Sequence, residues 1–528
     1  MRPRSYDLAI IGSGFGGSLL AMIARRLGLS VILLERTRHP RFAIGESTTP
    51  LTNLLLEESA RRFDLPRLLP LCKWGSWQTT HPEIACGLKR GFTFYHHEFG
   101  KKFRDDPMRR DQLMVAASPH DGIADTHWYR PDFDMFLMEE ARTLGAEYVD
   151  EVFLDAPVWK DGEVLLQGQR KTQPVSLHAR FMVDATGPRG YLHRALNLNE
   201  LPFEHLPATQ GLYTHFTGVQ RWESGSTGES GDSLPYPPDD AALHHVFDGG
   251  WIWVLRFNNG VTSAGVAAAD GLAKELGFAE GAPAWDRLLK RLPSVAEQFA
   301  QAKACFPFMH APRLSFRSEA ITGPGWAMLP FAAGFVDPLL STGFPLTLMG
   351  VRRLAEVLAC GDWSGPDFGA KLQRHEEQTR EELLAAERMV AALYANMGDF
   401  ETFSAVSLLY FAAVSYSETA RRLGKPELAD SFLLRNHPVF GPQFRQCLDE
   451  VRKKYSGQAK ADLLRRIREA VEPVDVAGLG NPDRHNRHPV DPDDLYRAAG
   501  KLKAEETEIN ALLERCGFYP SPRAPLPR

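Results

Sequence analysis

The hydrophobic residues near the start of the chain follow the order strand, helix, strand. An apolar run over residues 6–11 leads into a glycine-rich turn at 12–17, and apolar residues at helical spacing continue as far as Gly28. A second short apolar run covers residues 31–34. This pattern predicts a β-α-β unit, and therefore a fold of the α/β class built on a parallel sheet.

The turn between the first strand and the helix has the glycine spacing of a dinucleotide-binding site. Gly12 allows a tight turn, Gly14 lets backbone N–H groups approach a pyrophosphate, and Gly17 lets the helix lie against the strand. The N-terminus of the helix offers partial positive charge to the phosphates. Glu35 follows the second strand, where a carboxylate would accept a hydrogen bond from a ribose hydroxyl. The sequence therefore predicts that the chain binds a dinucleotide.

Two further glycine turns follow predicted strands later in the chain. Residues 181–184 form an apolar strand that runs into a turn at 185–190, which fits a return to the nucleotide-binding sheet. A third turn, at 332–343, precedes a helix that is predicted to begin near Phe344. The N-terminus of that helix would attract an anion such as a phosphate or a halide, and a helix cap without a ligand is the alternative.

The remaining pattern divides the chain into regions. Residues 1–200 and 319–360 contain the three turns and are predicted to form one discontinuous nucleotide-binding domain. Residues 201–318 are rich in strand patterns, and residues 361–518 are mostly at helical spacing. The tail at 519–528 carries four prolines and is predicted to be disordered.

Composition and charge narrow the class of protein. The chain has 528 residues, a net charge of −5 and 44% hydrophobic residues, which is typical of a globular protein and unfavourable for attraction to nucleic acid or to an anionic membrane. Its longest apolar stretch, 403–414, is too short to span a bilayer. The six cysteines are scattered and lack the spacing of a metal site. We expect a cytoplasmic protein with no metal, no nucleic acid partner and no membrane partner.

Several candidate residues have an ordinary structural explanation when the local pattern is considered alone. Lys89 lies at the start of an alternating strand pattern, and most lysines in such places are solvated. Glu46 and Ser47 lie in a polar loop before a predicted helix, so they suit a helix cap as well as a loop that returns to the nucleotide. Trp251 and Trp253 project from one face of a predicted strand, either as core residues or as the wall of a substrate pocket.

The order of the three turns resembles that of the flavoprotein monooxygenase superfamily. The glycine fingerprint comes first, a turn at 184–187 lies midway and a turn at 334–338 comes late, while residues 130–134 match the arginine-containing helix entry of that superfamily. Over roughly residues 5–400, the chain is similar to the flavin-dependent halogenases of the pyrrole and phenol type. This resemblance implies an α/β fold with a Rossmann-like FAD-binding domain, a strand-rich substrate domain and a helical C-terminal region.

The resemblance implies roles for particular residues. Lys89 stands where the family places its halogenating lysine, and Trp251 and Trp253 match the two tryptophans of the family's W-x-W-x-I-P motif. The residues that match the FAD-binding positions are Gly12, Gly14, Gly17, Glu35, Arg41, Glu46, Ser47, Arg130 and Asp337. The residues that match the halide-binding loop are Ser341, Thr342 and Gly343.

Two positions depart from the family pattern. Leu255 and Arg256 replace the Ile-Pro that ends the tryptophan motif, which puts a long cation beside the expected substrate pocket. Arginine keeps its charge and offers five donors, so Arg256 must pair with an acid, water or the substrate. Leu340 stands where tryptophan halogenases carry a glutamate that assists the lysine, and pyrrole- and phenol-type members also lack that glutamate. The second departure therefore bears on the substrate rather than on the chemistry.

The resemblance also implies a two-component reaction. A separate flavin reductase would supply reduced FAD, and chloride or bromide near Thr342 and Gly343 would be oxidised with dioxygen to a hypohalous acid. Lys89 would present this oxidant to a small electron-rich aromatic substrate, free or tethered to a carrier protein, because a compact ammonium donates hydrogen bonds and loses its proton readily on burial. Trp251 and Trp253 would keep the substrate away from the flavin. The alternatives are an FAD-dependent aromatic hydroxylase and a flavin-binding protein without catalytic activity.

Overall fold

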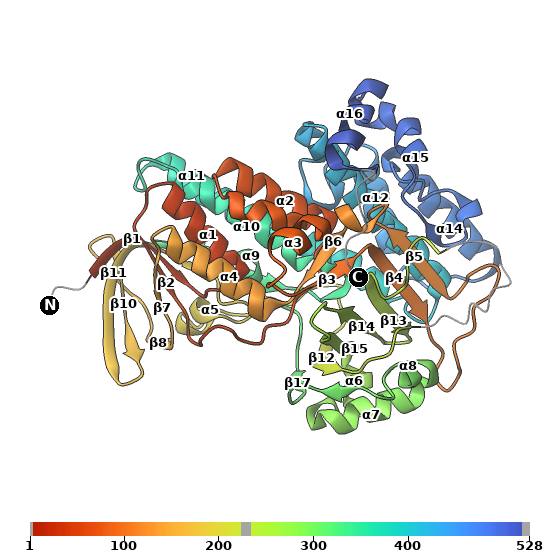
Figure 1. Ribbon diagram of the computed structural model, residues 1–528, viewed down its shortest axis with the longest axis horizontal. Helices are drawn as coiled ribbons and strands as arrows, with labels where there is room; N and C mark the ends of the chain where they lie inside the picture. The colour runs from red at the N-terminus through yellow and green to blue at the C-terminus, as the bar shows by residue number, and fades with distance from the viewer. Residues whose placement is uncertain (1–3, 223–233, 520–528) are drawn as a thin grey trace.

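Two large sheets, each packed against helices, form the body of the protein (Figure 1). The computed structural model describes residues 4–222 and 234–519. The predicted tail at 519–528 therefore lies outside the described residues, except for Tyr519. Within the described ranges, no helix is both long enough and apolar enough to cross a membrane.

The first sheet carries the predicted nucleotide-binding unit. Its main path runs in the order β19 (Thr322–Gly323), β20 (Trp326–Met328), β11 (Gln173–Asp184), β1 (Arg4–Ile11), β2 (Val31–Leu34) and β7 (Glu147–Val149). β1 pairs in parallel with both β2 and β11, and β11 pairs in parallel with β20. The carboxyl ends of β1 and β11 therefore lie side by side, at the edge where open α/β sheets bind ligands.

Helices cover one face of this sheet and a layer of strands covers the other. α1 (Phe15–Arg26), α4 (Arg130–Thr143) and α10 (Gly343–Leu358) share a core with Leu8 and Ile10 of β1. Ala9 and Ile11 project to the opposite face. The strands on that side are β8 (Val152–Leu154), β9 (Val158–Lys160) and β10 (Glu163–Arg170). Because both faces are buried there, the second half of β1, residues 8–11, and all of β2 are apolar without interruption. The predicted Rossmann-like α/β architecture is confirmed.

The second sheet joins strands from distant parts of the chain. Its order is β16 (Lys303–Ala304), β12 (Thr209–Thr217), β15 (Thr262–Ala269), β14 (Gly250–Arg256), β13 (Ala242–Phe247), β4 (Gly91–His96), β5 (Gln112–Ala116) and β22 (Arg487–His488), with β17 (Met309–Ala311) beside β12. β4, β5 and β22 come from outside the range 201–318, so the sheet extends beyond the predicted strand-rich region. The division of the chain into domains stays a prediction.

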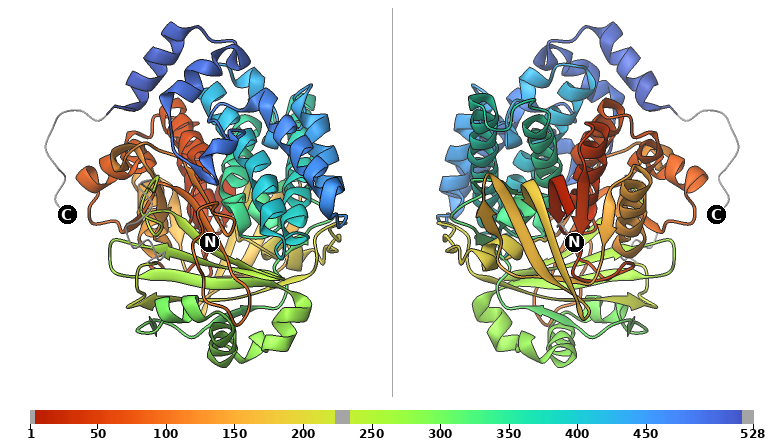
Figure 2. Two further views of the ribbon diagram at one scale, coloured as in Figure 1. Left: turned by 90° about the vertical axis from the view of Figure 1, so that its right-hand side faces the viewer. Right: turned by 90° about the vertical axis from the view of Figure 1, so that its left-hand side faces the viewer.

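Helices lie on both faces of the second sheet (Figure 2). α6 (Asp270–Leu276), α7 (Ala282–Arg291) and α8 (Pro293–Gln298) share a core with Ile252 and Val254. α11 (Pro366–Tyr394) and α12 (Phe400–Arg422) share a core with Trp251 and Trp253. Residues of β14 thus alternate between the two faces, as a strand requires. Further C-terminal helices are α13 (Phe440–Glu450), α14 (Gly457–Val471), α15 (Pro492–Arg497) and α16 (Glu506–Cys516).

A small antiparallel pair of strands lies between the two large sheets (Figure 1). It consists of β3 (Cys86–Lys89) and β6 (Asp125–Trp128), and β6 leads directly into α4. The loop between β2 and α2 (Pro50–Arg62) joins this pair through a bridge between Ser47 and His127. β3, β6 and the loop therefore meet where the nucleotide-binding sheet faces the second sheet.

Candidate active site

Close backbone contacts shape the glycine turn at the carboxyl end of β1. Gly12 has a φ of +102°, and a Cβ there would meet the carbonyl oxygen of Ala185 at 2.6 Å. A Cβ on Gly17 would lie 2.0 Å from the carbonyl oxygen of Gly12. Neither position has room for a side chain, so α1 packs directly on the turn and its first residues line a cavity.

Two guanidinium groups converge on Gly14. A Cβ at this position would lie 3.5 Å from Nη2 of Arg41 and 3.5 Å from Nη2 of Arg130. The Nε of Arg41 is buried and has no hydrogen-bond partner among the described residues. The first turn of α1 contains no acidic residue. Backbone amides and two cations therefore face the same space, which suits the pyrophosphate of a dinucleotide.

Glu35 lies just after β2 and is held by a set of hydrogen bonds. Its carboxylate accepts from the N–H and hydroxyl of Ser13 at 3.1 and 2.9 Å, and from those of Thr37 at 2.9 and 2.8 Å. Burial alone would raise the pKa of Glu35, but the Arg41 guanidinium and these hydrogen bonds hold it at about 2. Glu35 is therefore ionised at neutral pH, and a ribose hydroxyl would replace one of the two hydroxyl donors.

Arg130 anchors the loop that follows Glu35. Its guanidinium forms a two-point ion pair with Asp134, one helical turn later on α4, with both distances 2.7 Å. It also donates to the carbonyl oxygen of Gly45 at 2.8 Å. Because planar two-point pairs are geometrically specific, this contact positions the loop that carries Glu46 and Ser47.

Glu46 links this loop to the second sheet. Its Oε1 lies 2.7 Å from Nε2 of His215 on β12, and both side chains are fully buried. Its Oε2 is buried without a partner among the described residues. Glu46 thus presents one oxygen to His215 and leaves the other free beside the cavity that it lines.

Two adjoining cavities meet at these residues. The first cavity, of about 410 Å³, is lined by Gly14, Arg41, Glu46, Ser47, Arg130, Trp251, Trp253 and Asp337, among others. The second cavity, of about 580 Å³, is lined by Gly12 and Glu35. Arg41, Ala185 and Thr186 line both, so the cavities adjoin. Their sizes are typical of cofactor sites. The residues present therefore fit FAD.

Asp337 is a buried residue of the lining of the first cavity. Its carboxyl accepts hydrogen bonds from the N–H of Leu339 at 3.0 Å and from the hydroxyl of Tyr394 at 2.9 Å. Burial raises the pKa of Asp337 to about 7, although both hydrogen bonds act in the opposite direction. Asp337 thereby ties the late turn to α11.

The loop before α10 has an unusual backbone. Leu340 and Ser341 have φ values of +64° and +55°, which non-glycine residues seldom adopt. Ser341 and Gly343 line the first cavity, whereas Thr342 lines a small neighbouring cavity instead. α10 begins at Gly343 with no acidic residue in its first turn. Its N-terminal amides therefore suit an anion next to the first cavity.

The predicted substrate-pocket residues separate into two groups. Trp251 and Trp253 line the first cavity, with ring centroids 5.7 Å apart. Arg256 is absent from the described lining of that cavity, because its guanidinium points to the segment at 219–220. It pairs there with the buried Asp239 at 2.5 Å. Arg256 therefore pairs with an acid of the protein itself, and its assignment to the substrate pocket stays a prediction.

Lys89 is fully buried at the end of β3. Its ammonium donates to the hydroxyl of Ser47 at 2.9 Å and to the carbonyl oxygen of Thr48, and it lies 3.7 Å from the centroid of the Phe92 ring. Burial lowers the pKa of Lys89 to about 7, while the Asp125 carboxylate acts in the opposite direction. Lys89 therefore differs from the solvated lysine that its local pattern would suggest.

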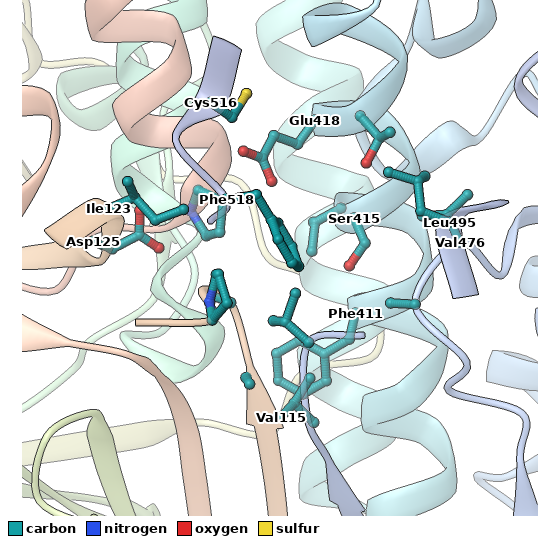
Figure 3. Close-up of a pocket in the computed structure, with 18 of the residues that line it drawn as sticks. Val115, Ile123, Asp125, Phe411, Ser415, Glu418, Val476, Leu495, Cys516 and Phe518 are labelled. Atoms are coloured by element: carbon teal, nitrogen blue, oxygen red, sulfur yellow. The ribbon is translucent and has the colours of Figure 1, made fainter. Parts of the chain in front are cut away.

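Lys89 lies between the first cavity and a third one. Ser47, which accepts its hydrogen bond, lines the first cavity, whereas Phe92 and Asp125 line the third. The third cavity has a volume of about 200 Å³. It is bounded by β6, α12 and the C-terminal segment that carries Phe518 (Figure 3). The lysine thus lies between a cofactor-sized space and one that is large enough for a small aromatic ring.

Asp125 faces Lys89 across the small pair of strands. The two residues are directly opposite in the antiparallel register, so their side chains project to the same face. Burial raises the pKa of Asp125 to about 7, and the Lys89 ammonium opposes this. Asp125 is absent from the predicted site residues, because local periodicity does not reveal which short strands pair.

Comparison with known proteins identifies related chains. A family model described as tryptophan halogenase matches residues 124–399. The monodechloroaminopyrrolnitrin halogenase PrnC of Pseudomonas fluorescens is 30% identical over 433 residues, which cover 77% of this chain and 70% of that protein. A 1H-pyrrole-2-carbonyl-[peptidyl-carrier protein] chlorinase of Pseudomonas fluorescens is 24% identical over 383 residues, which cover 70% of this chain and 80% of that protein.

Solved structures support the same fold. The crystal structure of halogenase PltM in complex with phloroglucinol and FAD superposes with a TM-score of 0.78 and 24% identity, over 91% of this chain and 99% of that chain. At this identity the likeness bears on the fold alone. The match of the family model and the relationship to PrnC together show that the chain belongs to the tryptophan halogenase family of flavin-dependent halogenases.

Proposed function

We propose that this halogenase acts on a small electron-rich ring of the phenol or pyrrole type, with reduced FAD supplied by a separate flavin reductase. The observation that carries the proposal is the position of Lys89, which is buried between the first and the third cavity. A small oxidant made in the first cavity would have to pass this ammonium to reach a ring in the third.

FAD would be held by the residues that converge on the first two cavities. Gly12 and Gly17 leave room for the close turn, and Gly14 faces Arg41 and Arg130 where the pyrophosphate would lie. The residues that would contact the ribose and the flavin are Glu35, Glu46, Ser47 and Asp337. When bound in its reduced form, FAD would supply two of the four electrons that dioxygen accepts. The halide would supply the other two and would thereby be oxidised.

Chloride or bromide would bind at the loop before α10. Ser341 and Gly343 line the first cavity, and the N-terminal amides of α10 provide donors and partial positive charge. Because Thr342 lines the neighbouring small cavity, it would contribute through its backbone rather than its hydroxyl.

Lys89 would steer the hypohalous acid and complete the proton balance. Its ammonium can hydrogen-bond the oxygen of the oxidant. As the carbon–halogen bond forms and the oxygen–halogen bond breaks, the departing hydroxide takes a proton from the ammonium and leaves as water. The neutral amine then accepts the proton that the ring carbon loses. Burial, which lowers the pKa of Lys89 to about 7, suits a group that must both give and take a proton.

Trp251 and Trp253 would keep the substrate apart from the flavin. Both rings line the first cavity, and their outer sides pack against α11 and α12. Large buried aromatics resist displacement, so they form a wall that a small oxidant bypasses and an aromatic ring does not.

The size of the third cavity and the substrates of the relatives support the proposed ring class. A volume of about 200 Å³ with largely apolar walls accepts a single aromatic ring. One relative acts on a carrier-bound pyrrole, and the neighbouring PltM structure contains a phenol. We therefore propose a phenol or pyrrole ring, and the test below includes free and carrier-tethered forms.

The test is a halide-dependent product assay with reduced FAD. The protein, a flavin reductase and chloride or bromide are incubated with phenols, pyrroles, indoles and a carrier-bound pyrrole, and products are analysed by mass spectrometry. A halogenated product that requires Lys89 and halide supports the proposal, with Lys89→Ala as the inactive control. A hydroxylated product formed without halide would instead indicate an aromatic hydroxylase, and an absence of flavin reoxidation would indicate a protein without catalytic activity.

A further inference from the structure

One carboxylate oxygen of Asp125 is buried and has no hydrogen-bond partner among the described residues. Oδ1 of Asp125 accepts a hydrogen bond from Nδ2 of Asn53 at 2.7 Å. Oδ2 is buried and has no partner among the described residues, and the whole residue is only 7% exposed. Lys89 does not donate a hydrogen bond to Oδ2, because its hydrogen bonds go to Ser47 and Thr48. A buried acceptor without a partner is costly, so a ligand donor that reaches it gains affinity.

Asp125 faces the third cavity (Figure 3). The opposite walls are mainly apolar, with Phe411 from α12 and Phe518 from the C-terminal segment. Two other carboxylates line the cavity: Glu418 forms an ion pair with Arg422 at 2.6 Å, and Asp491 accepts a hydrogen bond from the N–H of Asp493 at 3.0 Å and lies 3.8 Å from Arg484. Asp125 is therefore the acid of this cavity that has a free oxygen for a guest.

We propose that Oδ2 of Asp125 accepts a hydrogen bond from an O–H or N–H group on the aromatic substrate and directs halogenation to the ring carbon next to that donor. The inference rests on the proposed function, since it concerns how the ring is held for halogenation. It makes Asp125 a substrate-orienting residue and defines the substrate class as rings with a hydrogen-bond donor.

The choice of the neighbouring carbon follows from the register of β3 and β6. Asp125 and Lys89 are directly opposite, and opposite residues in an antiparallel pair have adjacent side chains. A donor held by Asp125 therefore lies at the Lys89 end of the cavity. The ortho carbon of a phenol, or the carbon beside the nitrogen of a pyrrole, is the ring position closest to that donor. The para carbon lies across the ring, away from Lys89.

The first arm of the test compares substrates that differ only in the donor. Phenol is paired with anisole, and pyrrole with N-methylpyrrole, under the conditions of the product assay. Wild type should halogenate phenol at the ortho carbon and pyrrole beside the nitrogen, and should use the methylated partners about 100-fold less well in kcat/KM. NMR of the products gives the position. If the methylated rings are used equally well, or if phenol reacts mainly at the para carbon, the inference is wrong.

The second arm uses Asp125→Asn, which keeps the shape and the acceptor for Asn53 but replaces the free acceptor by a donor. Loss of the Asp125 charge lowers the pKa of Lys89 and affects both rings alike, so the readout is the ratio: kcat/KM for phenol should fall about 10- to 100-fold more than that for anisole. The matched control is Asp121→Asn, an exposed aspartate that pairs with Arg90, and it should behave as wild type. Thermal melting and FAD content show whether each variant is folded. A folded Asp125→Asn protein that keeps the preference for phenol over anisole would overturn the inference.

The third arm measures binding without turnover, so that the two proposals fail separately. Calorimetric titration of the wild-type protein with phenol should give a Kd about tenfold lower than for anisole, and Asp125→Asn should remove that difference. Equal Kd values for phenol and anisole in wild type would contradict the inference. If wild type distinguishes the two rings but halogenates neither, the proposed function fails while recognition by Asp125 stands.

Discussion

Replacing Lys89 with methionine tests whether this lysine is kept for chemistry at the expense of stability. The ammonium is fully buried, and its pKa is lowered from 10.5 to about 7, chiefly by burial. Burial thus disfavours the ammonium relative to water, so the folded protein holds this charge at a cost in stability. Methionine would place an uncharged, polarisable side chain beside the Phe92 ring, where the ammonium now lies.

We expect the Lys89→Met protein to be at least as stable as wild type at pH 6. Burial raises the pKa of Asp125 to about 7 even with the cation present, so without it this carboxyl is mainly protonated at pH 6. No unpaired charge is then left buried. Replacing buried charge by apolar groups is typically neutral or stabilising by about 1–4 kcal/mol. For a chain of 528 residues, 1 kcal/mol corresponds to about 1 °C in Tm, so the expected change is about 0 to +4 °C.

The difference between variant and wild type should shrink as the pH rises from 6 to 9. The folded pKa of Lys89 lies below its unfolded value, so between about 7 and 10.5 the unfolded chain binds more protons and wild-type stability rises with pH. The variant lacks this contribution. In addition, the folded pKa of Asp125 lies above its unfolded value of 3.8, so its contribution to stability falls as the pH rises toward the folded pKa.

The prediction is tested by calorimetric measurement of Tm at pH 6 and pH 9 and by the halogenation assay. Halogenated product should fall by about 100-fold or more, while reduced flavin is still reoxidised. Lys101→Met is the matched control, because Lys101 is exposed and pairs with Glu98 at the surface, and it should change neither measurement. A Tm several degrees below wild type at pH 6, or product at the wild-type rate, would refute the reasoning.

Three further substitutions test the nucleotide site and the departure at Arg256. Gly17→Ala places a Cβ 2.0 Å from the carbonyl oxygen of Gly12, so flavin absorbance of the purified protein should fall close to zero. Glu35→Gln should flatten the acid side of the stability profile in thermal melts, because a carboxylate with a folded pKa of about 2 contributes stability above pH 4.5 that is lost as the pH falls toward 2. Arg256→Met leaves the buried Asp239 unpaired and should lower the free energy of unfolding by about 2–3 kcal/mol, less than for a fully buried pair, with product identity unchanged in the halogenation assay.

The nucleotide-binding unit could be predicted from the sequence because its constraints act over short distances along the chain. The lack of space for side chains at Gly12 and Gly17 arises within one turn and its neighbouring strand. The apolar runs of β1 and β2 report burial on both faces directly. The position of Trp251 and Trp253 on one face of β14 likewise follows from strand geometry alone.

Lys89 was identified by resemblance rather than by its local pattern, and its environment was decided by tertiary structure. Its burial results from the pairing of β3 with β6 and from the loop that brings Ser47 and Thr48 to its ammonium. Periodicity indicates that a segment is a strand but not which strand lies beside it. For the same reason, the sequence does not reveal the position of Asp125 beside Lys89 or the extent of the second sheet.

Arg256 shows most clearly what the sequence determines and what only the fold determines. The sequence alone established that a guanidinium in this position needs a partner, because an unpaired charge inside a protein is costly. Only the fold decided that the partner is Asp239. The chemical needs of a residue are therefore set by its type and can be inferred from the sequence. The groups that meet those needs come from distant segments, so they are known only when the chain has folded.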